Sequence, residues 1–256
     1  MAIYTTEIAS DRIKSDNPIH QRLLKAYYLA IDEVKGDLLE IGCGEGRGVH
    51  LFKDKVSSFT GIDKIQEVVD NLTHQYPEAK FQQANIPPLP FADEQFDSVI
   101  SFQVIEHIKD DKKYLEEIAR VLKQGGKALL TTPNIKKSLS RNPWHIREYT
   151  ADQLESLCKP YFAEVKMLGV AGNDKVMEYY TQNKASVEKL MRFDVLNLQY
   201  HLPAFMLKIP YEFMNRLNRN KLQDNDDSLV ASIHHEDYLL SENAAASLDL
   251  FAVLTR

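Results

Sequence analysis

The chain has little cysteine and no long apolar run, and each absence excludes a class of protein. Its only cysteines, Cys43 and Cys158, lie far apart and in neither metal-binding nor redox spacing. No apolar segment approaches the length of a membrane span. The first 16 residues lack the apolar core of a signal peptide. We therefore expect a cytoplasmic protein with reduced thiols and no membrane segment.

The chain also has fewer basic than acidic residues. The 256 residues carry 31 lysines and arginines against 37 acidic residues, a formal net charge of -6. Such a balance disfavours extensive binding to nucleic acid or to an anionic membrane. The length and the 44% hydrophobic content suffice for one large domain, or for a domain with a sizeable insertion. The chain has no internal repeats.

Glycine is scarce, with ten residues in all, yet three of them stand at alternate positions in one loop. The segment LLEIGCGEGRG (38–48) runs from an apolar strand through Gly42, Gly44 and Gly46. A strand that passes through such a loop into a helix is typical of nucleotide-type binding sites. The dinucleotide fingerprint requires glycine where Arg47 stands, and Glu40 would repel a pyrophosphate. The loop therefore predicts a ligand with positive charge.

Short apolar runs alternate with amphipathic segments from residue 38 to about residue 168. The runs are typical of buried parallel strands, and the segments between them place apolar residues on one helical face. This alternation predicts a doubly wound α/β fold with a mostly parallel sheet of seven strands, whose ligand lies at the carboxyl ends of the strands. The expected strands are 38–41, 58–63, 96–102, 127–132, 161–170 and 248–256, with a further strand before Asn85, and the expected helices are 17–34, 64–76, 112–126 and 150–158.

Residues 171–247 are too long for a loop and predict a helical insertion before the last strand. We expect residues 1–170 and 248–256 to form the main domain, and the insertion to cover the acceptor site. Within it, 184–202 has a helical pattern, whereas 218–228 is polar and predicts a mobile stretch.

Two further motifs complete the predicted site. Asp63 ends the second strand, about 20 residues after the first loop glycine, where an acid can accept both hydroxyls of a ribose. Residues 82–108 then read QQANIPPLPFADEQFDSVISFQVIEHI. With this segment the chain resembles the class I S-adenosylmethionine-dependent methyltransferases. It is most similar to the subgroup with L-P-F before the fourth strand and E-H-I after it. The resemblance covers 36–132 well and extends to 143–170 and 248–256.

The resemblance implies S-adenosylmethionine as cofactor and S-adenosylhomocysteine as product. Asn85 departs from the family's usual aspartate near the adenine, but its amide oxygen still accepts a hydrogen bond. The cofactor-binding residues that the resemblance implies lie in the glycine loop and after the second, third and fourth strands: Glu40, Gly42, Cys43, Gly44, Asp63, Lys64, Ile65, Asn85, Ile86, Phe102 and Gln103.

The candidate catalytic residues are His107, His145 and Arg147. An alcohol acceptor needs a base near neutral pH, and histidine is the usual one. His107 follows the fourth strand in E-H-I, and is equally well read as structural. His145 and Arg147 lie in NPWHIREYT (142–150), where we weigh a base and a grip on an acidic acceptor against a plain helix entry capped by Thr150.

Three weaker patterns accompany these residues. The segment 133–147 is locally basic, with Lys136, Lys137 and Arg141 among its residues, and either attracts an acidic acceptor or is a solvated loop. The pair His234–His235 has no second cluster of ligands, so we expect no metal. Five aromatic residues of the insertion either wall the acceptor pocket or pack within the insertion: Tyr179, Tyr180, Tyr200, Phe205 and Tyr211.

The sequence thus predicts a methyltransferase for a small molecule, with an oxygen of a sugar, a lipid precursor or a secondary metabolite as the first choice. We expect a monomer or homodimer with no nucleic-acid or membrane partner. The alternatives are a tRNA or protein methyltransferase, a protein that binds the cofactor without catalysis, and a nicotinamide oxidoreductase, which Arg47 and Glu40 disfavour.

Overall fold

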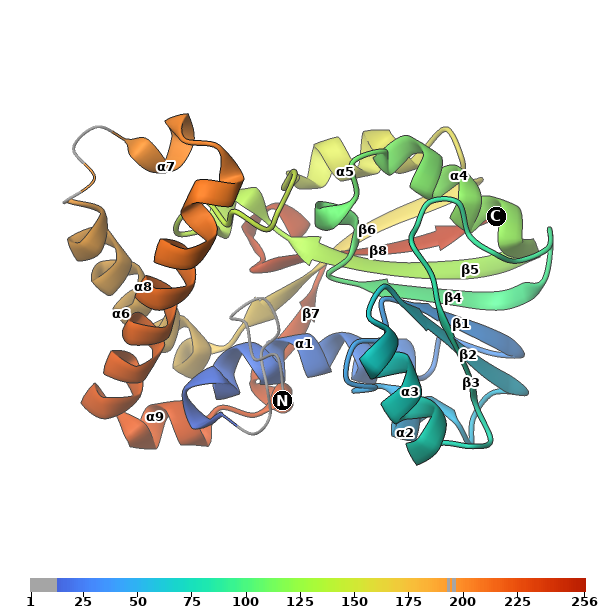
Figure 1. Ribbon diagram of the computed structural model, residues 1–256, viewed down its shortest axis with the longest axis horizontal. Coiled ribbons are helices and arrows are strands. Elements are labelled where there is room, and N and C mark those ends of the chain that lie inside the picture. The colour runs from blue at the N-terminus through green and yellow to red at the C-terminus, as the bar shows by residue number, and fades with distance from the viewer. Residues whose placement is uncertain (1–12, 193, 195–196) are drawn as a thin grey trace.

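One twisted sheet organises the molecule. The computed structural model describes residues 13–192, 194 and 197–256. Within them eight strands pair in the order β3-β2-β1-β4-β5-β8-β6-β7 (Figure 1). The strands are β1 (Asp37–Ile41), β2 (Ser58–Asp63), β3 (Lys80–Gln83), β4 (Phe96–Phe102), β5 (Leu122–Pro133), β6 (Glu164–Gly172), β7 (Tyr238–Ser241) and β8 (Asp249–Thr255).

Parallel pairing brings the ends of the first four strands to a single edge. β1 pairs in parallel with β2 and β4, β2 pairs in parallel with β3, and β4 pairs in parallel with β5. β8 runs antiparallel between β5 and β6. The carboxyl ends of β1, β2, β3 and β4 therefore lie side by side, which is where ligands bind in open α/β sheets.

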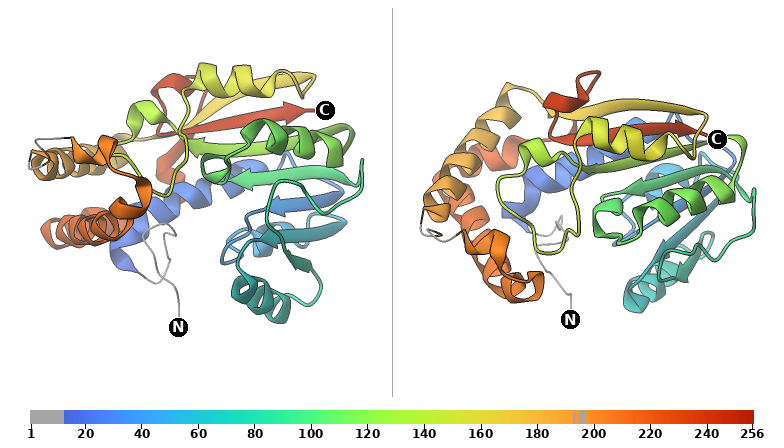
Figure 2. Two further views of the ribbon diagram at one scale, coloured as in Figure 1. Left: turned by 45° about the horizontal axis from the view of Figure 1, so that its top comes forward. Right: turned by 90° about the horizontal axis from the view of Figure 1, so that it is seen from above.

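Helices cover both faces of this sheet, as a doubly wound fold requires (Figure 2). One apolar core contains Tyr114, Ile118 and Leu154, which α4 (Asp111–Val121) and α5 (Ala151–Cys158) present to one face. The other core contains Tyr27 of α1 (Asn17–Ala30) and Phe52 of α2 (Val49–Phe52). α3 (Gln66–Gln75) lies beside β2 and β3.

The long segment before the last strand is mainly helical and packs beside one end of the sheet. It contains α6 (Asp174–Met191), α7 (Leu198–His201), α8 (Ala204–Asn225) and α9 (Asp227–Ser232). In Figure 1, α6 and α8 lie at the left, beyond the end toward which the arrowhead of β5 points. They therefore face the carboxyl ends of the parallel strands.

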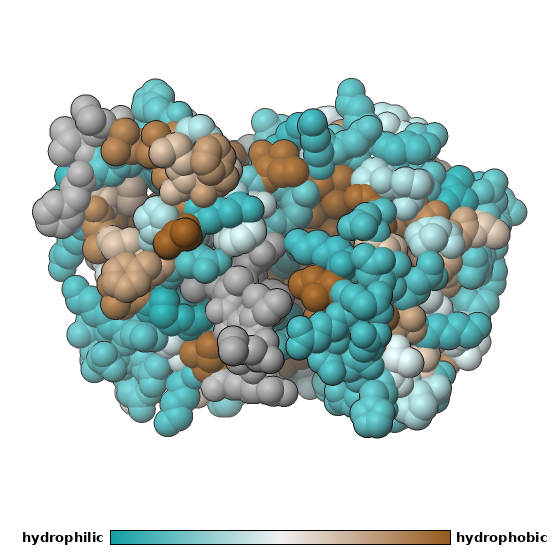
Figure 3. All heavy atoms as spheres, viewed as in Figure 1, coloured by the Kyte–Doolittle hydropathy of each residue, from teal (hydrophilic) through white to brown (hydrophobic). Residues whose placement is uncertain are grey.

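The outer face of α8 is apolar and exposed. Phe205, Ile209 and Phe213 recur at helical spacing and are 73%, 82% and 63% exposed. Brown side chains gather over this part of the molecule in Figure 3. Among the described residues, none of the helices has the length and apolar character that a membrane crossing requires.

The predicted fold class is confirmed, and several boundaries agree closely. The strands at 58–63 and 96–102 match β2 and β4, and the last strand matches β8. The capping box at Thr150 is present, since its hydroxyl accepts from Gln153 N and Gln153 Oε1 accepts from Thr150 N. The prediction that no signal peptide opens the chain falls largely on residues 1–12, which lie outside the described residues.

Three expectations were wrong in detail. The sheet has eight strands, because Tyr238–Ser241 inside the predicted insertion pairs with β6. The helix predicted to end at Gly125–Gly126 ends at Val121, because Leu122 is fully buried and pairs with Phe96 in the sheet. Gly125, with φ of 71°, serves an irregularity of β5 instead. The polar stretch 218–228 is helical, and Leu222 within it is buried.

Candidate functional site

The glycine loop turns back under the sheet edge and leaves an open surface. The backbone N–H groups of Gly42 and Cys43 donate to the carbonyl of Ile62, at 2.8 and 3.0 Å. A Cβ at Gly42 would lie 2.5 Å from Val104 Cγ2, so this position admits no side chain. A Cβ at Gly44, by contrast, would meet nothing within 4 Å. The loop therefore exposes bare backbone to whatever lies over Gly44.

Asp63 is held at the end of β2 with its carboxylate beside this loop. One oxygen accepts from Gly44 N at 3.0 Å, and the other accepts from Ile65 N at 3.0 Å. Each carboxylate oxygen can accept a second hydrogen bond. The geometry thus fixes the carboxylate against the loop while it keeps the capacity to accept from two ligand hydroxyls.

Glu40 is a buried acid with an unsatisfied oxygen. Its side chain is 1% exposed, and Oε1 accepts from the Tyr27 hydroxyl at 2.7 Å. Oε2 has no hydrogen-bond partner. Burial raises the pKa of Glu40 to about 8. An unpaired buried carboxyl group is costly, so this oxygen is suited to a cationic donor brought by a ligand.

The other predicted cofactor residues gather at the same edge. Phe102 is buried at the end of β4 and meets Tyr27 edge-on, with ring centroids 4.9 Å apart. Gln103 follows with a positive φ of 58° and donates from its backbone to Thr131 O at 2.9 Å. Ile65 and Ile86 are half-buried, whereas Lys64 and Asn85 are exposed. A bare loop, a carboxylate with spare acceptor capacity and an orphaned carboxyl oxygen together fit a ligand that carries hydroxyl groups and an ammonium group.

A second hollow adjoins this edge. It is a cavity of about 250 Å³ between the strand ends and the helices α6 and α8. Gln103, Glu106 and His107 form its wall toward the sheet, and Arg219 lies on its helical side. The lining mixes polar and apolar side chains, and a molecule placed here would lie between the strand edge and the helical segment.

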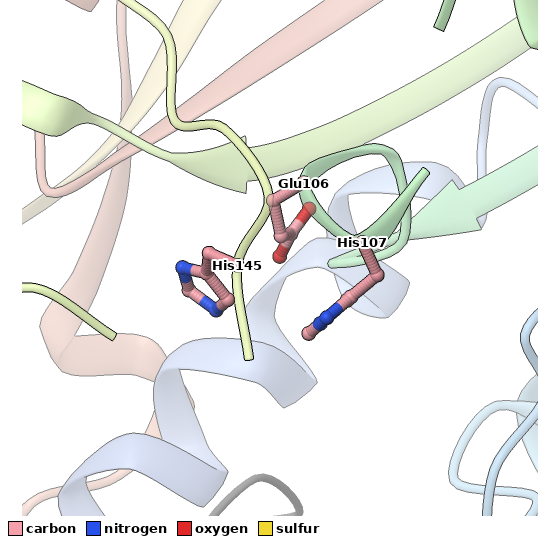
Figure 4. A group of neighbouring side chains, drawn as sticks. All are labelled: Glu106, His107 and His145. Atoms are coloured by element: carbon pink, nitrogen blue, oxygen red, sulfur yellow. The ribbon is translucent and has the colours of Figure 1, made fainter. Parts of the chain in front are cut away.

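Glu106, His107 and His145 converge inside this cavity (Figure 4). Glu106 and His107 belong to a 3-10 turn after β4, and His145 lies in the loop after β5. The loop is tied to the turn because Ile146 N and Arg147 N donate to Glu106 O, at 2.8 and 3.3 Å. The rings of His107 and His145 lie edge to face, with centroids 5.0 Å apart.

Each of the three side chains is oriented by a partner behind it. Thr132 Oγ1 donates to Glu106 Oε2 at 3.0 Å, and His107 Nδ1 lies 3.0 Å from Trp144 O. His145 Nδ1 lies 2.6 Å from Glu148 Oε1. A carbonyl and a carboxylate accept hydrogen bonds only, so Nδ1 carries the proton in both rings and Nε2 carries the lone pair.

Burial also shifts the pKa values of this cluster. It raises the pKa of Glu106 to about 7, against the opposing effect of His145. It lowers the pKa of His107 to about 4, and the neighbouring His145 acts in the same direction. His107 is therefore a neutral imidazole near neutral pH.

The basic segment after β5 is used differently from the prediction. Arg147 lies outside the cavity lining and pairs with Asp111, which also accepts from the Tyr149 hydroxyl at 2.8 Å. Arg141 donates to Gln199 O and Leu202 O, and so ties this segment to α7. Of the lysines and arginines named in 133–147, only Lys137 lines the cavity. The structure thus places Arg147 outside the cavity, and its grip on an acceptor stays a prediction.

The helical segment supplies residues that the sequence pattern did not reveal. Tyr179, Tyr180 and Tyr211 line the cavity as one interpretation held, while Tyr200 and Phe205 are exposed. Arg22 and Arg219 also line it, paired with Asp249 at 3.2 Å and Asp16 at 3.0 Å. The members of each pair lie far apart in the sequence, and no local pattern predicts that they form an ion pair.

Comparisons with known proteins agree with this geometry. Residues 39–130 match the sequence model of the methyltransferase domain family. A probable S-adenosylmethionine-dependent methyltransferase of Mycobacterium tuberculosis is 36% identical over 59% of this chain and 57% of its own length. A phthiotriol/phenolphthiotriol dimycocerosates methyltransferase of Mycobacterium leprae is 25% identical over 69% of this chain and 60% of its own. The chain thus spans little more than half the length of these relatives.

Solved structures share the fold. A methyltransferase from Thermotoga maritima superposes with a TM-score of 0.58 at 14% identity, over 93% of this chain and 90% of that one. The YcgJ protein from Bacillus subtilis gives a TM-score of 0.55 at 19% identity, over 90% and 97%. Residues 39–130 therefore carry the methyltransferase-domain match, and the chain as a whole shares the fold of these structures. The cofactor of this family is S-adenosylmethionine, and the site at the strand ends fits it.

Proposed function

We propose that this protein transfers a methyl group from S-adenosylmethionine to an oxygen of a small-molecule acceptor in the cavity beside the strand ends. The observation that supports this most strongly is that the exposed loop at Gly44 and the cavity lie at the same edge of the sheet. The bare surface over Gly44 suits the cofactor, and the cavity begins at Gln103, directly after β4. Alignment of donor and acceptor is the main contribution of an enzyme to such a transfer.

The cofactor would be held by the residues at the sheet edge. Asp63 accepts from the ribose hydroxyls, Glu40 Oε2 accepts from the ammonium group, and the Gly44 backbone lies beneath the amino-acid tail. Phe102 and Gln103 border its methionine end, and Ile65, Ile86 and Asn85 its adenine. When bound, the cofactor supplies a methyl group on a positively charged sulfur, which an oxygen nucleophile displaces in line.

His145 and His107 face the acceptor and promote loss of its hydroxyl proton, either directly as bases or through a bound ion. Nδ1 of each ring is fixed from behind, so Nε2 carries the lone pair, which at His145 accepts from the Asn142 amide nitrogen. Replacement of His145 by alanine is therefore expected to reduce turnover far more than cofactor affinity. Equal turnover with the acceptor would reject a role for His145.

Among acceptors, two observations support a lipid precursor. A relative from Mycobacterium leprae acts, by its name, on phthiotriol and phenolphthiotriol dimycocerosates. The apolar outer face of α8 also offers contact to a molecule with a hydrophobic part. An acidic group on the acceptor, a monomeric or dimeric state and a cytoplasmic location stay predictions, as does the covering of the acceptor by residues 171–247.

The test is transfer of labelled methyl from S-adenosylmethionine to a cell extract, followed by separation of lipid, aqueous-metabolite, RNA and protein fractions. We expect label in the lipid fraction, and less of it with the His145 variant. Label in the aqueous metabolites would support a sugar or other polar acceptor. Label in RNA or protein would support a macromolecular substrate. Absence of label from a protein that binds the cofactor would favour a binding protein without catalysis.

A further inference from the structure

The cluster of Glu106, His107 and His145 has the composition of a metal site. One ligand atom from each residue lies within 4.8 Å of the other two. This is the single group of its kind among the residues that the structure describes. Ligand atoms around a zinc-sized ion lie about 3 to 3.5 Å apart, so small side-chain rotations would complete the set. We propose that these three side chains bind a divalent transition-metal ion at the acceptor site, an inference that rests on the proposed function for its catalytic role.

The carboxylate makes the strongest case for a cation. Glu106 is fully buried, and its Oε1 has no hydrogen-bond partner. Thr132 donates to the other oxygen, and the carboxyl group lies between the two imidazole rings (Figure 4). A buried carboxyl oxygen without a donor costs free energy unless something positive binds it.

The two histidines are arranged as metal ligands usually are. A ligating histidine donates its other ring N–H to a carbonyl or carboxylate, which fixes the tautomer. Trp144 O has this role for His107, and Glu148 Oε1 has it for His145. At His145, Nε2 accepts from the Asn142 amide nitrogen at 2.8 Å, because Asn142 Oδ1 is occupied by Trp144 N. An ion would replace this amide donor.

The ligand set indicates the class of ion. Two imidazoles and one carboxylate suit zinc, manganese or ferrous iron rather than magnesium, which prefers oxygen ligands. Three protein ligands leave positions open, as in catalytic sites. The cluster opens onto the acceptor cavity, so an acceptor hydroxyl can take an open position.

A cation here gives the acceptor oxygen its reactivity. Coordination lowers the pKa of a bound hydroxyl, which releases its proton to solvent water. An electron pair of the oxygen then forms the bond to the methyl carbon, while the pair of the carbon–sulfur bond returns to sulfur and leaves a neutral thioether. In this arrangement His145 orients the ion and is not itself the base.

The binding test uses the protein after removal of metal by a chelator, titrated with Co²⁺ alone. Trp144 is the only tryptophan of the chain and directly precedes a proposed ligand, so its fluorescence reports on the site. We expect one equivalent of Co²⁺ to quench it, with visible absorption from the ion and displacement by Zn²⁺. The variants E106Q, H107Q and H145Q should each lose this binding, and E148Q should weaken it about 10- to 100-fold.

The matched control is H74Q, which replaces an exposed histidine of α3 and should leave Co²⁺ binding unchanged. His107 and His145 are partly exposed, so their variants keep the test decisive if E106Q does not fold. Absence of stoichiometric Co²⁺ in the wild-type protein, or its retention in the histidine variants, would overturn the proposal. Calorimetry with S-adenosylmethionine on the same samples separates the two ideas, because failure of cofactor binding would refute the proposed function and leave the metal count unaffected.

Discussion

The two halves of the site are built in different ways. The half at the sheet edge takes its residues from the ends of four adjacent strands, and the pairing of β1 with β2 and β4 fixes how they meet. The other half takes its residues from α1, the 3-10 turn after β4, the loop after β5, and the helices α6 and α8. The first half depends on a regular scaffold, and the second depends on how an inserted segment packs against it.

This difference explains why the cofactor is easier to infer than the acceptor. Strand ends in a parallel sheet always meet at one edge, so spacing along the chain predicts proximity in space. Inserted helices follow no such rule, and acceptor specificity varies between proteins of one fold for the same reason. Changes in the two halves should therefore have separable effects.

The largest difference in cofactor affinity is expected between alanine variants of two glycines with similar backbone conformations. Gly44 and Gly125 have φ of 49° and 71°, and a Cβ on either would meet nothing within 4 Å. Alanine at either position costs about 1 kcal/mol of backbone strain. Only G44A also places a methyl group on the cofactor surface, so it should weaken S-adenosylmethionine binding at least about 30-fold, since contacts worth about 2 kcal/mol are lost. Calorimetry on both variants checks this. Equal affinities for S-adenosylmethionine would show that Gly44 does not lie against the cofactor.

A change in the helical half should impair use of the acceptor and leave cofactor affinity unchanged. Tyr211 of α8 lines the cavity and lies away from the loop of Gly44. We expect Y211A to lower kcat/KM for the acceptor about tenfold, the effect of losing roughly 1.4 kcal/mol of contact, while the Kd of the cofactor stays within twofold. A matched loss of cofactor affinity would show that the two halves are not independent.

The pH dependence of cofactor binding tests whether Glu40 binds the ammonium group of the cofactor. With a pKa of about 8 in the free protein, this carboxyl group is mostly protonated at pH 7. A bound ammonium group favours the carboxylate, so binding should release a proton and affinity should rise as the pH increases from 6 toward 8. Calorimetry in buffers of different ionisation enthalpy measures this release.

The variant E40Q should bind without that proton release and with lower affinity for S-adenosylmethionine. Methylthioadenosine, which lacks the amino-acid tail, serves as the control ligand. Its affinity should be equal for the wild-type protein and E40Q. Unchanged proton release in E40Q would assign the effect to another group.

The smallest effect is expected at Arg147. It is about half exposed and pairs with Asp111 outside the cavity. We predict that R147A changes the acceptor KM by less than about twofold and lowers the free energy of unfolding by less than about 1 kcal/mol, as for other exposed pairs. Steady-state kinetics and denaturant unfolding measure both. A large rise in KM would support the acceptor-binding role first predicted for this residue.

Local rules in the sequence accounted for most of the fold and for the sheet-edge half of the site. Apolar runs located β2 and β4, and the expected cap at Thr150 is present as a full capping box. Gly125 misled the prediction because a positive φ serves a strand irregularity as readily as a helix end. Glu106 and His145 lie close together because backbone hydrogen bonds join the turn after β4 to the loop after β5. No local sequence pattern predicts these bonds.

The central claim is that the strand edge binds S-adenosylmethionine through the carboxylate of Asp63, and titration calorimetry tests it most directly. The wild-type protein should bind one cofactor per chain. D63A should bind at least about 100-fold more weakly, since two charge-assisted hydrogen bonds of about 1.5 kcal/mol or more each are lost. The matched control is D70A, which replaces an exposed aspartate of α3 and should bind the cofactor as the wild type does. Equal affinity of D63A and D70A would contradict the account.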